Sequence, residues 1–161
     1  MPASIIKALK KIILSSTMLA ICAFLWSFKG LMNEQEWISW GNRFFTEAYD
    51  ASVEPKLKKY EISLTPDHFI RLRKTYQQGK QEYFSFNLQR FTTLGYKPGQ
   101  GNTDTITVST RTDDIIVQTY NDPEGDVDSM ATTLNLPVKK MPAQKLDSLK
   151  QALAFLKEKQ L

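Results

Sequence analysis

The chain has 161 residues, of which 42% are hydrophobic and 24% are charged. These proportions are typical of an ordinary folded domain and exclude a polytopic membrane protein or a disordered tail. The formal net charge is +4, but residues 1–29 hold four lysines and no acidic residue, and the other 17 basic residues balance the 17 acidic ones. The chain beyond residue 29 is therefore neutral and lacks the basic surface that nucleic-acid binding requires, so we expect no nucleic-acid partner.

An uncharged, largely apolar run covers residues 12–28. As a helix it nearly spans a hydrocarbon core of ~30 Å, and extended to residue 32 it predicts a transmembrane signal-anchor helix over 12–32. The predicted anchor side chains are Ile12, Leu14, Leu19, Ile21, Phe24, Leu25, Trp26 and Phe28. Before it, residues 1–11 form a basic tail with Lys7, Lys10 and Lys11. The positive-inside rule then places the N-terminus in the cytoplasm and the rest outside, as in a bacterial inner-membrane protein that faces the periplasm.

Three other interpretations of this segment stay open. A signal peptide could be cleaved after Ser27 or Gly30, although the run is long for one. Cys22, the single cysteine, ends a lipobox-like Leu-Ala-Ile-Cys and could carry lipid, although the residue before such a cysteine is normally small. The segment could also be a buried helix of a soluble protein. Without further cysteines, the following domain can hold neither a disulfide nor a cysteine metal site.

Residues 33–50 predict a juxtamembrane helix with a broad aromatic face. Asn33 is its candidate N-cap, and acidic residues follow in the first turn. We rank packing of this face on the domain's own core first, anchoring in the membrane interface second and contact with a partner helix third. The candidate partner or interface contacts are Trp37, Trp40, Phe44 and Phe45.

Residues 51–59 are expected to form a linker, and residues 60–161 an extracytoplasmic domain. Alternation predicts a strand over 60–64, and Thr65 followed by Pro66 predicts the start of a second helix that ends at Gly79. A strand is predicted over 81–91, and a glycine-rich loop over 95–103.

The remaining elements follow from β-rich and amphipathic patterns. Strands over 105–110 and 115–120 are predicted to form a hairpin through 111–114, followed by an acidic turn over 121–128 and a last strand over 129–138. Leucines at helical spacing predict a helix over 143–160, with a core face ranked above a coiled-coil face. The predicted fold class is α+β: a small antiparallel sheet with helices packed on one face.

Few residues in the domain point to chemistry. His68 is the only histidine and is expected on a helix face. The acidic turn holds Asp122, Glu124, Asp126 and Asp128, but its spacing departs from that of an EF-hand calcium loop. A solvated turn is expected, with a weak calcium site as the alternative. The glycine-rich loop lacks the Gly-Lys-Ser/Thr ending of a phosphate-binding loop.

Three basic residues on the predicted second helix, Arg71, Arg73 and Lys74, are candidates for contact with anionic lipid headgroups. A solvated helix face is the more frequent origin of such a cluster, since acidic residues are interspersed.

These features predict a single-pass envelope protein that acts by binding another protein of the membrane or periplasm: an assembly or secretion component, or a toxin or incoming factor that it neutralises. One alternative is a lipid- or small-ligand-binding module, with Phe84, Phe86 and Tyr120 lining a pocket. Another is a membrane-tethered enzyme that uses His68 and the acidic turn. We expect no enzyme activity, and we assign no catalytic, cofactor-binding or metal-binding residue.

Overall fold

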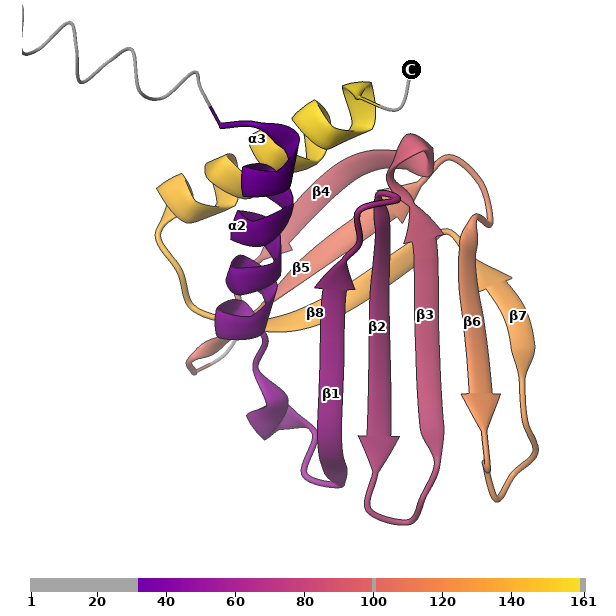
Figure 1. Cartoon of the computed structure of the whole chain (residues 1–161). Coiled ribbons are helices and arrows are strands. Elements are labelled where there is room, and N and C mark those ends of the chain that lie inside the picture. The colour runs from indigo at the N-terminus through magenta and orange to yellow at the C-terminus, as the bar shows by residue number, and fades with distance from the viewer. Residues whose placement is uncertain (1–31, 100, 160–161) are drawn as a thin grey trace, which may run out of the picture. The chain divides into compact units, whose positions relative to one another are not determined.

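The computed structural model of the chain describes residues 32–99 and 101–159, which form an α+β domain (Figure 1). The basic tail over 1–11 and the anchor side chains from Ile12 to Phe28 lie outside the described residues. In the part that is described, neither helix has the length and apolar character needed to cross a membrane.

The domain contains two α-helices and eight strands among its described residues. The α-helices are α2 (Glu34–Ala48) and α3 (Ala143–Glu158), and two short 3₁₀ turns are η2 (Ala51–Val53) and η3 (Leu88–Arg90). The strands are β1 (Leu57–Leu64), β2 (Phe69–Tyr76), β3 (Gln81–Asn87), β4 (Phe91–Lys97), β5 (Thr103–Thr110), β6 (Ile115–Tyr120), β7 (Asp128–Ala131) and β8 (Thr133–Lys139).

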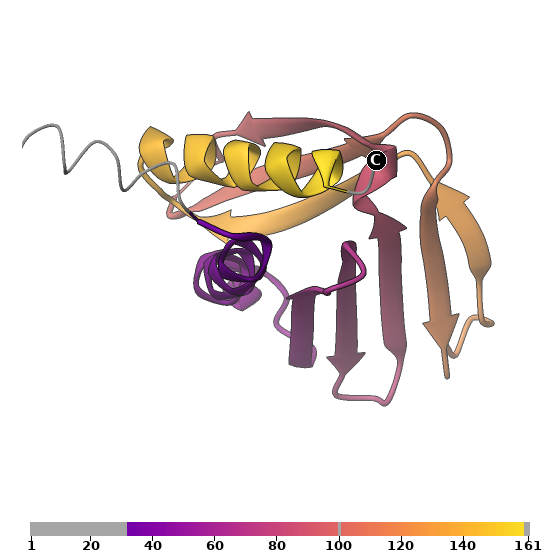
Figure 2. The same cartoon turned by 45° about the horizontal axis from the view of Figure 1, so that its top comes forward.

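The strands form two antiparallel sheets that share a corner. One sheet has five strands in the order β1-β2-β3-β6-β7, and the other has three in the order β4-β5-β8. Because β3 runs into β4, β5 into β6 and β7 into β8, each of these chain segments crosses from one sheet to the other. Strands that change sheet at a bend are typical of orthogonally packed sheets. The two sheets therefore act as one strongly bent antiparallel sheet (Figure 2).

Hydrogen bonds between the three crossing segments hold the corner. The N–H of Thr110 donates to the carbonyl of Thr132 at 2.9 Å, and the Thr132 hydroxyl donates to Asp113 at 2.6 Å. The N–H of Arg111 donates to the carbonyl of Arg90 at 3.2 Å, which joins the β5–β6 segment to η3. Each crossing strand is thus fixed to its neighbour where the regular ladder stops.

One hydrophobic core joins both sheets and both helices. The five-stranded sheet contributes alternate residues such as Leu64, Ile70 and Phe86, and α3 lies along the three-stranded sheet (Figure 2). The leucine stripe of α3 is buried, as expected for a core face: its members are Leu146, Leu149, Leu153 and Leu156. The predicted helices over 33–50 and 143–160 are confirmed as α2 and α3.

The predicted second helix, over 65–79, is wrong, because this segment is a turn followed by β2. Thr65 does not cap a helix: its N–H donates to the carbonyl of Phe69 at 2.9 Å, and its hydroxyl oxygen accepts from the N–H of Phe69 at 3.0 Å. Ile70 and Leu72 are both fully buried. A strand buries two residues that are two positions apart on the same face, whereas the predicted helical face did not include Ile70. Gly79, at φ 91°, lies in the β2–β3 hairpin turn.

Four further predictions need correction. Residues 105–110 and 115–120 do not pair as a hairpin: β5 pairs with β4 and β8, whereas β6 pairs with β3 and β7. The expected linker over 51–59 holds η2 and the start of β1, and the glycine-rich loop shrinks to 98–102. The segment 129–138 is divided by a bend at Thr132 into β7 and β8, so that two sheets replace the single one expected.

Candidate functional site

The five-stranded sheet has an outward face that the core does not use. Strand register aligns one polar row across all five strands: Glu61, Arg73, Tyr83, Gln118 and Asp128. The alternate residues face inward and include buried Ile62 and Leu72. No described element lies over the outward face in either ribbon view (Figures 1 and 2). We call this surface the outward face.

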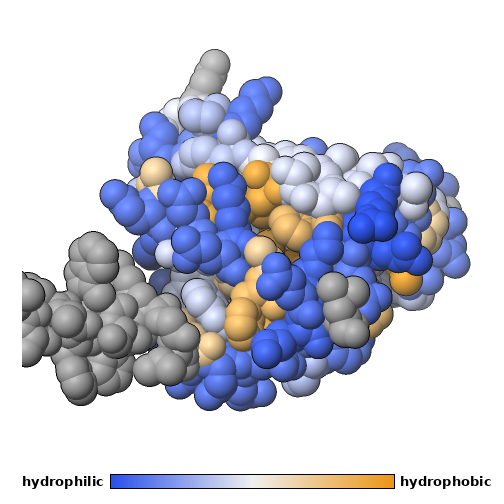
Figure 3. Space-filling view, turned by 90° about the horizontal axis from the view of Figure 1, so that it is seen from above, coloured by the Kyte–Doolittle hydropathy of each residue, from blue (hydrophilic) through white to orange (hydrophobic). Residues whose placement is uncertain are grey.

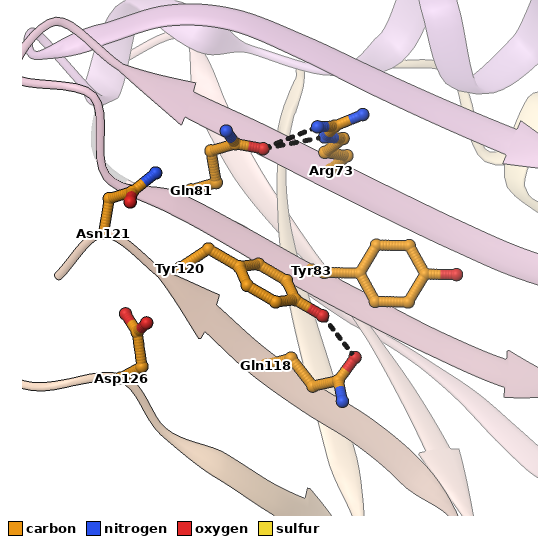
Figure 4. Close-up of a pocket in the computed structure, with 7 residues that line it drawn as sticks. All are labelled: Arg73, Gln81, Tyr83, Gln118, Tyr120, Asn121 and Asp126. Atoms are coloured by element: carbon orange, nitrogen blue, oxygen red, sulfur yellow. Dashed lines mark hydrogen bonds between the residues drawn. The ribbon is translucent and has the colours of Figure 1, made fainter.

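A hollow of about 560 Å³ lies on the outward face over β2, β3, β6 and the turn after β6. Its lining combines two tyrosines, three carboxamides and one charge of each sign: Arg73, Gln81, Tyr83, Gln118, Tyr120, Asn121 and Asp126 (Figure 4). We call it the tyrosine–amide hollow. It is the candidate functional site because it joins aromatic surface to many hydrogen-bonding groups.

Local hydrogen bonds orient the strand residues of the hollow. Arg73 donates from Nε and Nη2 to Oε1 of Gln81, at 3.1 and 2.6 Å, across the β2–β3 pair. Tyr120 donates to Oε1 of Gln118 at 3.1 Å (Figure 4). These three bonds use the carboxamide oxygens of Gln81 and Gln118 and leave the two NH₂ groups as donors toward a ligand.

The turn after β6 adds the last two groups. Asn121 has φ 55°, a left-handed conformation that asparagine tolerates better than most residues. In the part of the chain that the structure describes, no hydrogen bond engages the Asn121 side chain. Asp126 accepts from the N–H of Asp122 through Oδ1 at 2.9 Å, so its second oxygen remains an acceptor. The turn thus supplies a donor and an acceptor beside the tyrosines.

The hollow suits recognition through neutral contacts. Its one cation, Arg73, and its one carboxylate, Asp126, leave no net charge that would select a phosphate or a cation. Tyrosine and arginine are, with tryptophan, the side chains most enriched among the dominant contacts of protein interfaces, because they combine a large contact area with directed hydrogen bonds. The arrangement can therefore hold an uncharged polar group or a segment of a protein.

On the inward side, beyond the apolar core, a network of ion pairs ties η2 to β2 and β3. Lys74 donates to both oxygens of Glu54, at 2.8 and 3.0 Å, and Tyr49 donates to Glu54 at 2.6 Å. The Tyr76 hydroxyl lies 2.8 Å from Glu82 and 3.1 Å from Glu54, so its one proton serves one carboxylate at a time. Lys80 pairs with Asp122 at 2.8 Å and with Glu82 at 3.3 Å.

The electrostatics of this network favour its charged carboxylates. Burial tends to raise the pKa of Glu54, but hydrogen bonds from Lys74 and Tyr49 outweigh it and hold that pKa below its usual value of 4.5. The hydrogen bond from Lys80 lowers the pKa of Asp122. Because each carboxylate already has cationic or phenolic partners, we assign the network a structural role.

The three proposed headgroup contacts do not form one patch. Arg71 and Arg73 lie on the outward face of β2, but Lys74 faces inward and binds Glu54. This separation follows from the correction of the predicted helix to a strand, in which neighbouring residues point to opposite faces. Likewise Phe84 and Phe86 face inward, whereas Tyr120 faces outward, so the pocket expected from them does not exist.

The four aromatic residues of α2 divide into two pairs. Phe44 and Phe45 are 5% and 2% exposed and belong to the core, so they are not available to a partner. Trp37 and Trp40 are only partly buried, contact each other edge to face at 5.9 Å between ring centroids, and cover the core from outside. Figure 3 views the domain from above and shows apolar side chains between polar ones.

His68 lies in the β1–β2 turn, not on a helix. It is 6% exposed, has φ 59°, and its Nε2 lies 2.8 Å from Oε1 of Glu34 at the start of α2. The eight residues of β2 separate it from Lys80 and the acidic turn, a distance of about 25 Å at the rise of a strand. The residues considered for a carboxylate enzyme are therefore not brought together.

The acidic turn and the glycine-rich loop are held by their own contacts. Asp122 accepts from the N–H of Glu124 at 3.1 Å as well as from Lys80. The N–H of Gly99 donates to buried Asp104 at 2.9 Å, and a Cβ at Gly99 would lie 2.2 Å from the carbonyl oxygen of Thr103. Over residues 32–99 and 101–159, no group of three or more His, Cys, Asp and Glu could hold a metal ion.

Sequence reasoning identified Arg73, Tyr120 and Asp126 as candidates but not the hollow. The sequence did not reveal the strand register. The pairing of β2 with β3 places Arg73 opposite Tyr83, and the pairing of β3 with β6 places Tyr83 opposite Gln118 and Gln81 opposite Tyr120. With β6 assigned to a hairpin with β5, these residues could not be placed together. Comparison of the chain with protein-family models, with curated protein sequences and with solved structures finds no significant match.

Proposed function

We propose that this chain is a membrane-anchored binding protein. In this proposal residues 12–32 cross the membrane as a signal anchor, the N-terminus lies in the cytoplasm, and the α+β domain faces the periplasm of a bacterial envelope. The support is the apolar run over 12–28 with lysines before it. The domain binds a protein partner: an assembly or secretion component, or a toxin or incoming factor that it neutralises.

The tyrosine–amide hollow is the observation that carries the binding proposal. Two tyrosines and an arginine on a rigid sheet offer the partner contact area at a small cost in side-chain entropy. Apolar side chains continue the surface at its edge, since Met130 is 50% and Tyr120 47% exposed. Exposed apolar side chains beside polar ones are typical of protein-binding surfaces, and the outward face has this character.

The test is affinity capture of the full-length chain from mild-detergent membranes. A Tyr83→Ser, Tyr120→Ser double variant removes both rings from the outward face while keeping polar side chains. We expect it to lose a stoichiometric partner that the unchanged chain retains. The matched control, Lys150→Ala with Gln151→Ala, alters exposed positions of α3 and should retain the partner. Equal recovery with both double variants would remove the hollow from the proposal.

The anchor needs its own test. Cys22 is the only cysteine, so Cys22→Ser with Gln151→Cys places one thiol on the exposed face of α3. A membrane-impermeant maleimide added to intact spheroplasts should label this thiol. Protection until the membrane is lysed would overturn the proposed orientation, and an intact mass shortened at Cys22 in the natural chain would show a lipoprotein instead.

A second candidate function is binding of a small neutral polyhydroxy ligand, such as a saccharide, in the hollow. The specific observation that favours it is Asn121, whose side chain is held at the hollow by a left-handed backbone and engages no described residue. Carboxamides beside tyrosine rings can bind adjacent hydroxyls and stack on a sugar face. Chemical-shift changes at the Asn121 and Gln118 side-chain amides on titration with chito-oligosaccharides would support it, and unchanged shifts would exclude that ligand.

A further inference from the structure

The exposed edge of β7 differs from the other end of the same sheet. In the order β1-β2-β3-β6-β7, β7 is an edge strand, and the two ribbon views agree that no described element lies beyond it (Figures 1 and 2). At the opposite edge, the Asn42 side chain binds both backbone groups of Leu64. The last residue of the β1 edge is therefore bonded by α2, whereas no described element lies along the β7 edge.

The ladder shows which backbone groups of β7 are free. The N–H of Thr119 donates to the carbonyl of Val127 at 2.9 Å, which marks these residues as a hydrogen-bonded pair. Bonded and non-bonded pairs alternate in antiparallel sheets, so Ser129 and Ala131 also bond to β6, and Asp128 and Met130 turn their N–H and C=O groups outward. The same alternation turns the N–H and C=O groups of Leu64 in β1 away from β2, and the Asn42 side chain bonds to both.

The side chains at this edge indicate what would occupy it. Met130 lies on the outward face beside Ile116 and is 50% exposed, and Asp128 lies two residues earlier beside Gln118. Asp126, with an oxygen left to accept, lies just before the strand. An incoming strand would therefore meet an acidic group and an apolar group two positions apart on one face.

We propose that β7 receives an extended segment of a partner protein by strand addition, and that this segment carries a basic side chain two residues from an apolar one. This inference rests on the proposed function and specifies how that partner binds. Backbone bonds to Asp128 and Met130 supply the pairing, and the side-chain alternation supplies selectivity. A second copy of this chain fits less well, because both edges would bring Asp126 and Asp128 to the contact.

Photocross-linking of the full-length chain in its membrane tests the mode of binding. Benzoylphenylalanine is placed at Val127 beside the edge, at Tyr120 in the hollow, or at Gln151 on α3 as a control. Each is combined with Met130→Pro or Met130→Thr. Proline removes the outward N–H without breaking a bond to β6, whereas threonine keeps that N–H and suits a strand. Urea unfolding of each variant verifies that the domain stays folded, and hydrogen exchange at Ser129 and Ala131 verifies that β7 stays paired with β6.

We expect the Val127 adduct to fall about tenfold in Met130→Pro, from loss of a backbone bond and the clash of the ring, and to persist in Met130→Thr. The cross-linked partner peptide should hold a basic residue two positions from an apolar one. An adduct that Met130→Pro leaves unchanged, or one with the mass of two copies of this chain, would overturn strand addition. An adduct at Tyr120 alone would overturn it and leave the proposed function standing. Absence of adducts at both sites would overturn both.

Discussion

Asn42 of α2 binds Leu64 of β1 through both ends of its carboxamide. Its Nδ2 donates to the carbonyl of Leu64 at 2.8 Å, and its Oδ1 accepts from the N–H of Leu64 at 2.7 Å. The side chain thus takes the place that a neighbouring strand would occupy. This contact attaches α2 to the sheet and satisfies the two backbone groups of Leu64 that would otherwise lie unpaired at the end of the β1 edge.

We predict that Asn42→Ala lowers the free energy of unfolding by about 1–3 kcal/mol, because two hydrogen bonds are lost and the part-buried groups of Leu64 are left without partners. Urea unfolding of a fragment of residues 32–161 measures the change. Arg43→Ala, at the next and exposed position of α2, is the control and should change stability by less than about 0.5 kcal/mol. Equal effects of the two variants would contradict the role of Asn42.

The Lys74–Glu54 pair makes the second prediction. The two side chains are only 12% and 19% exposed, so Lys74→Met leaves the Glu54 carboxylate with phenolic partners alone in a poorly solvated place. We expect a loss of about 2 kcal/mol in the free energy of unfolding, below the 3–5 kcal/mol typical of fully buried pairs.

A double-mutant cycle separates the pair from its surroundings. If the loss arises from an unpaired charge, Lys74→Met combined with Glu54→Gln should recover about half of it, because no uncompensated carboxylate remains. Strict additivity of the two single variants would show that Lys74 and Glu54 are not coupled.

The same network predicts how stability depends on pH. Folding lowers the pKa of Glu54 and Asp122, so their contribution is present above the unfolded pKa values of 4.5 and 3.8 and is lost as the pH falls through the lowered values. The hydrogen bond that Lys80 donates to Asp122 raises the pKa of Lys80, and burial raises the pKa of Tyr49 and Tyr76. Those contributions are present below the unfolded values and are lost as the pH rises through the folded ones.

Urea midpoints measured from pH 3 to pH 11 should therefore form a plateau between about pH 5 and pH 9, with a fall on each side. Glu54→Gln should reduce the fall on the acid side, and Lys80→Met the fall on the alkaline side. A midpoint that rises below pH 4 would contradict the assigned directions.

The sequence predicted the elements that depend on contacts within one segment better than those that depend on pairing between distant segments. The helices α2 and α3 were predictable because their apolar faces repeat within one segment. At β2 the local signals conflicted: Thr65-Pro66 is typical of a helix start, and Phe69, Leu72 and Tyr76 fit a helical face. Pairing with β1 and β3 decided for a strand, since it buries Ile70 and Leu72 together. Such pairing is a tertiary effect that overrides local propensity.

The candidate site depended on long-range register even more. The β5–β6 segment contains four polar residues, Arg111 to Asp114, that look like a hairpin turn, but Thr132 pairs with this segment and turns it into a corner. Only that corner sends β6 to β3 and brings Tyr120 opposite Gln81. The residue types of this segment correctly indicated a polar turn. They did not indicate that the strands on its two sides belong to different sheets.

His68 makes the last prediction, because its backbone and its side chain have separable roles. Its φ of 59° suits asparagine but strains a β-branched residue, and its Nε2 holds Glu34 of α2 at 2.8 Å. His68→Asn should keep the turn and cost about 1 kcal/mol for the lost contact, whereas His68→Val should cost about 1–3 kcal/mol more through backbone strain. Hydrogen exchange should then quicken in the first turns of α2 for both variants, and in the β1–β2 turn for His68→Val alone. Faster exchange at the β1–β2 turn in His68→Asn would show that the side chain, not the backbone conformation, holds the turn.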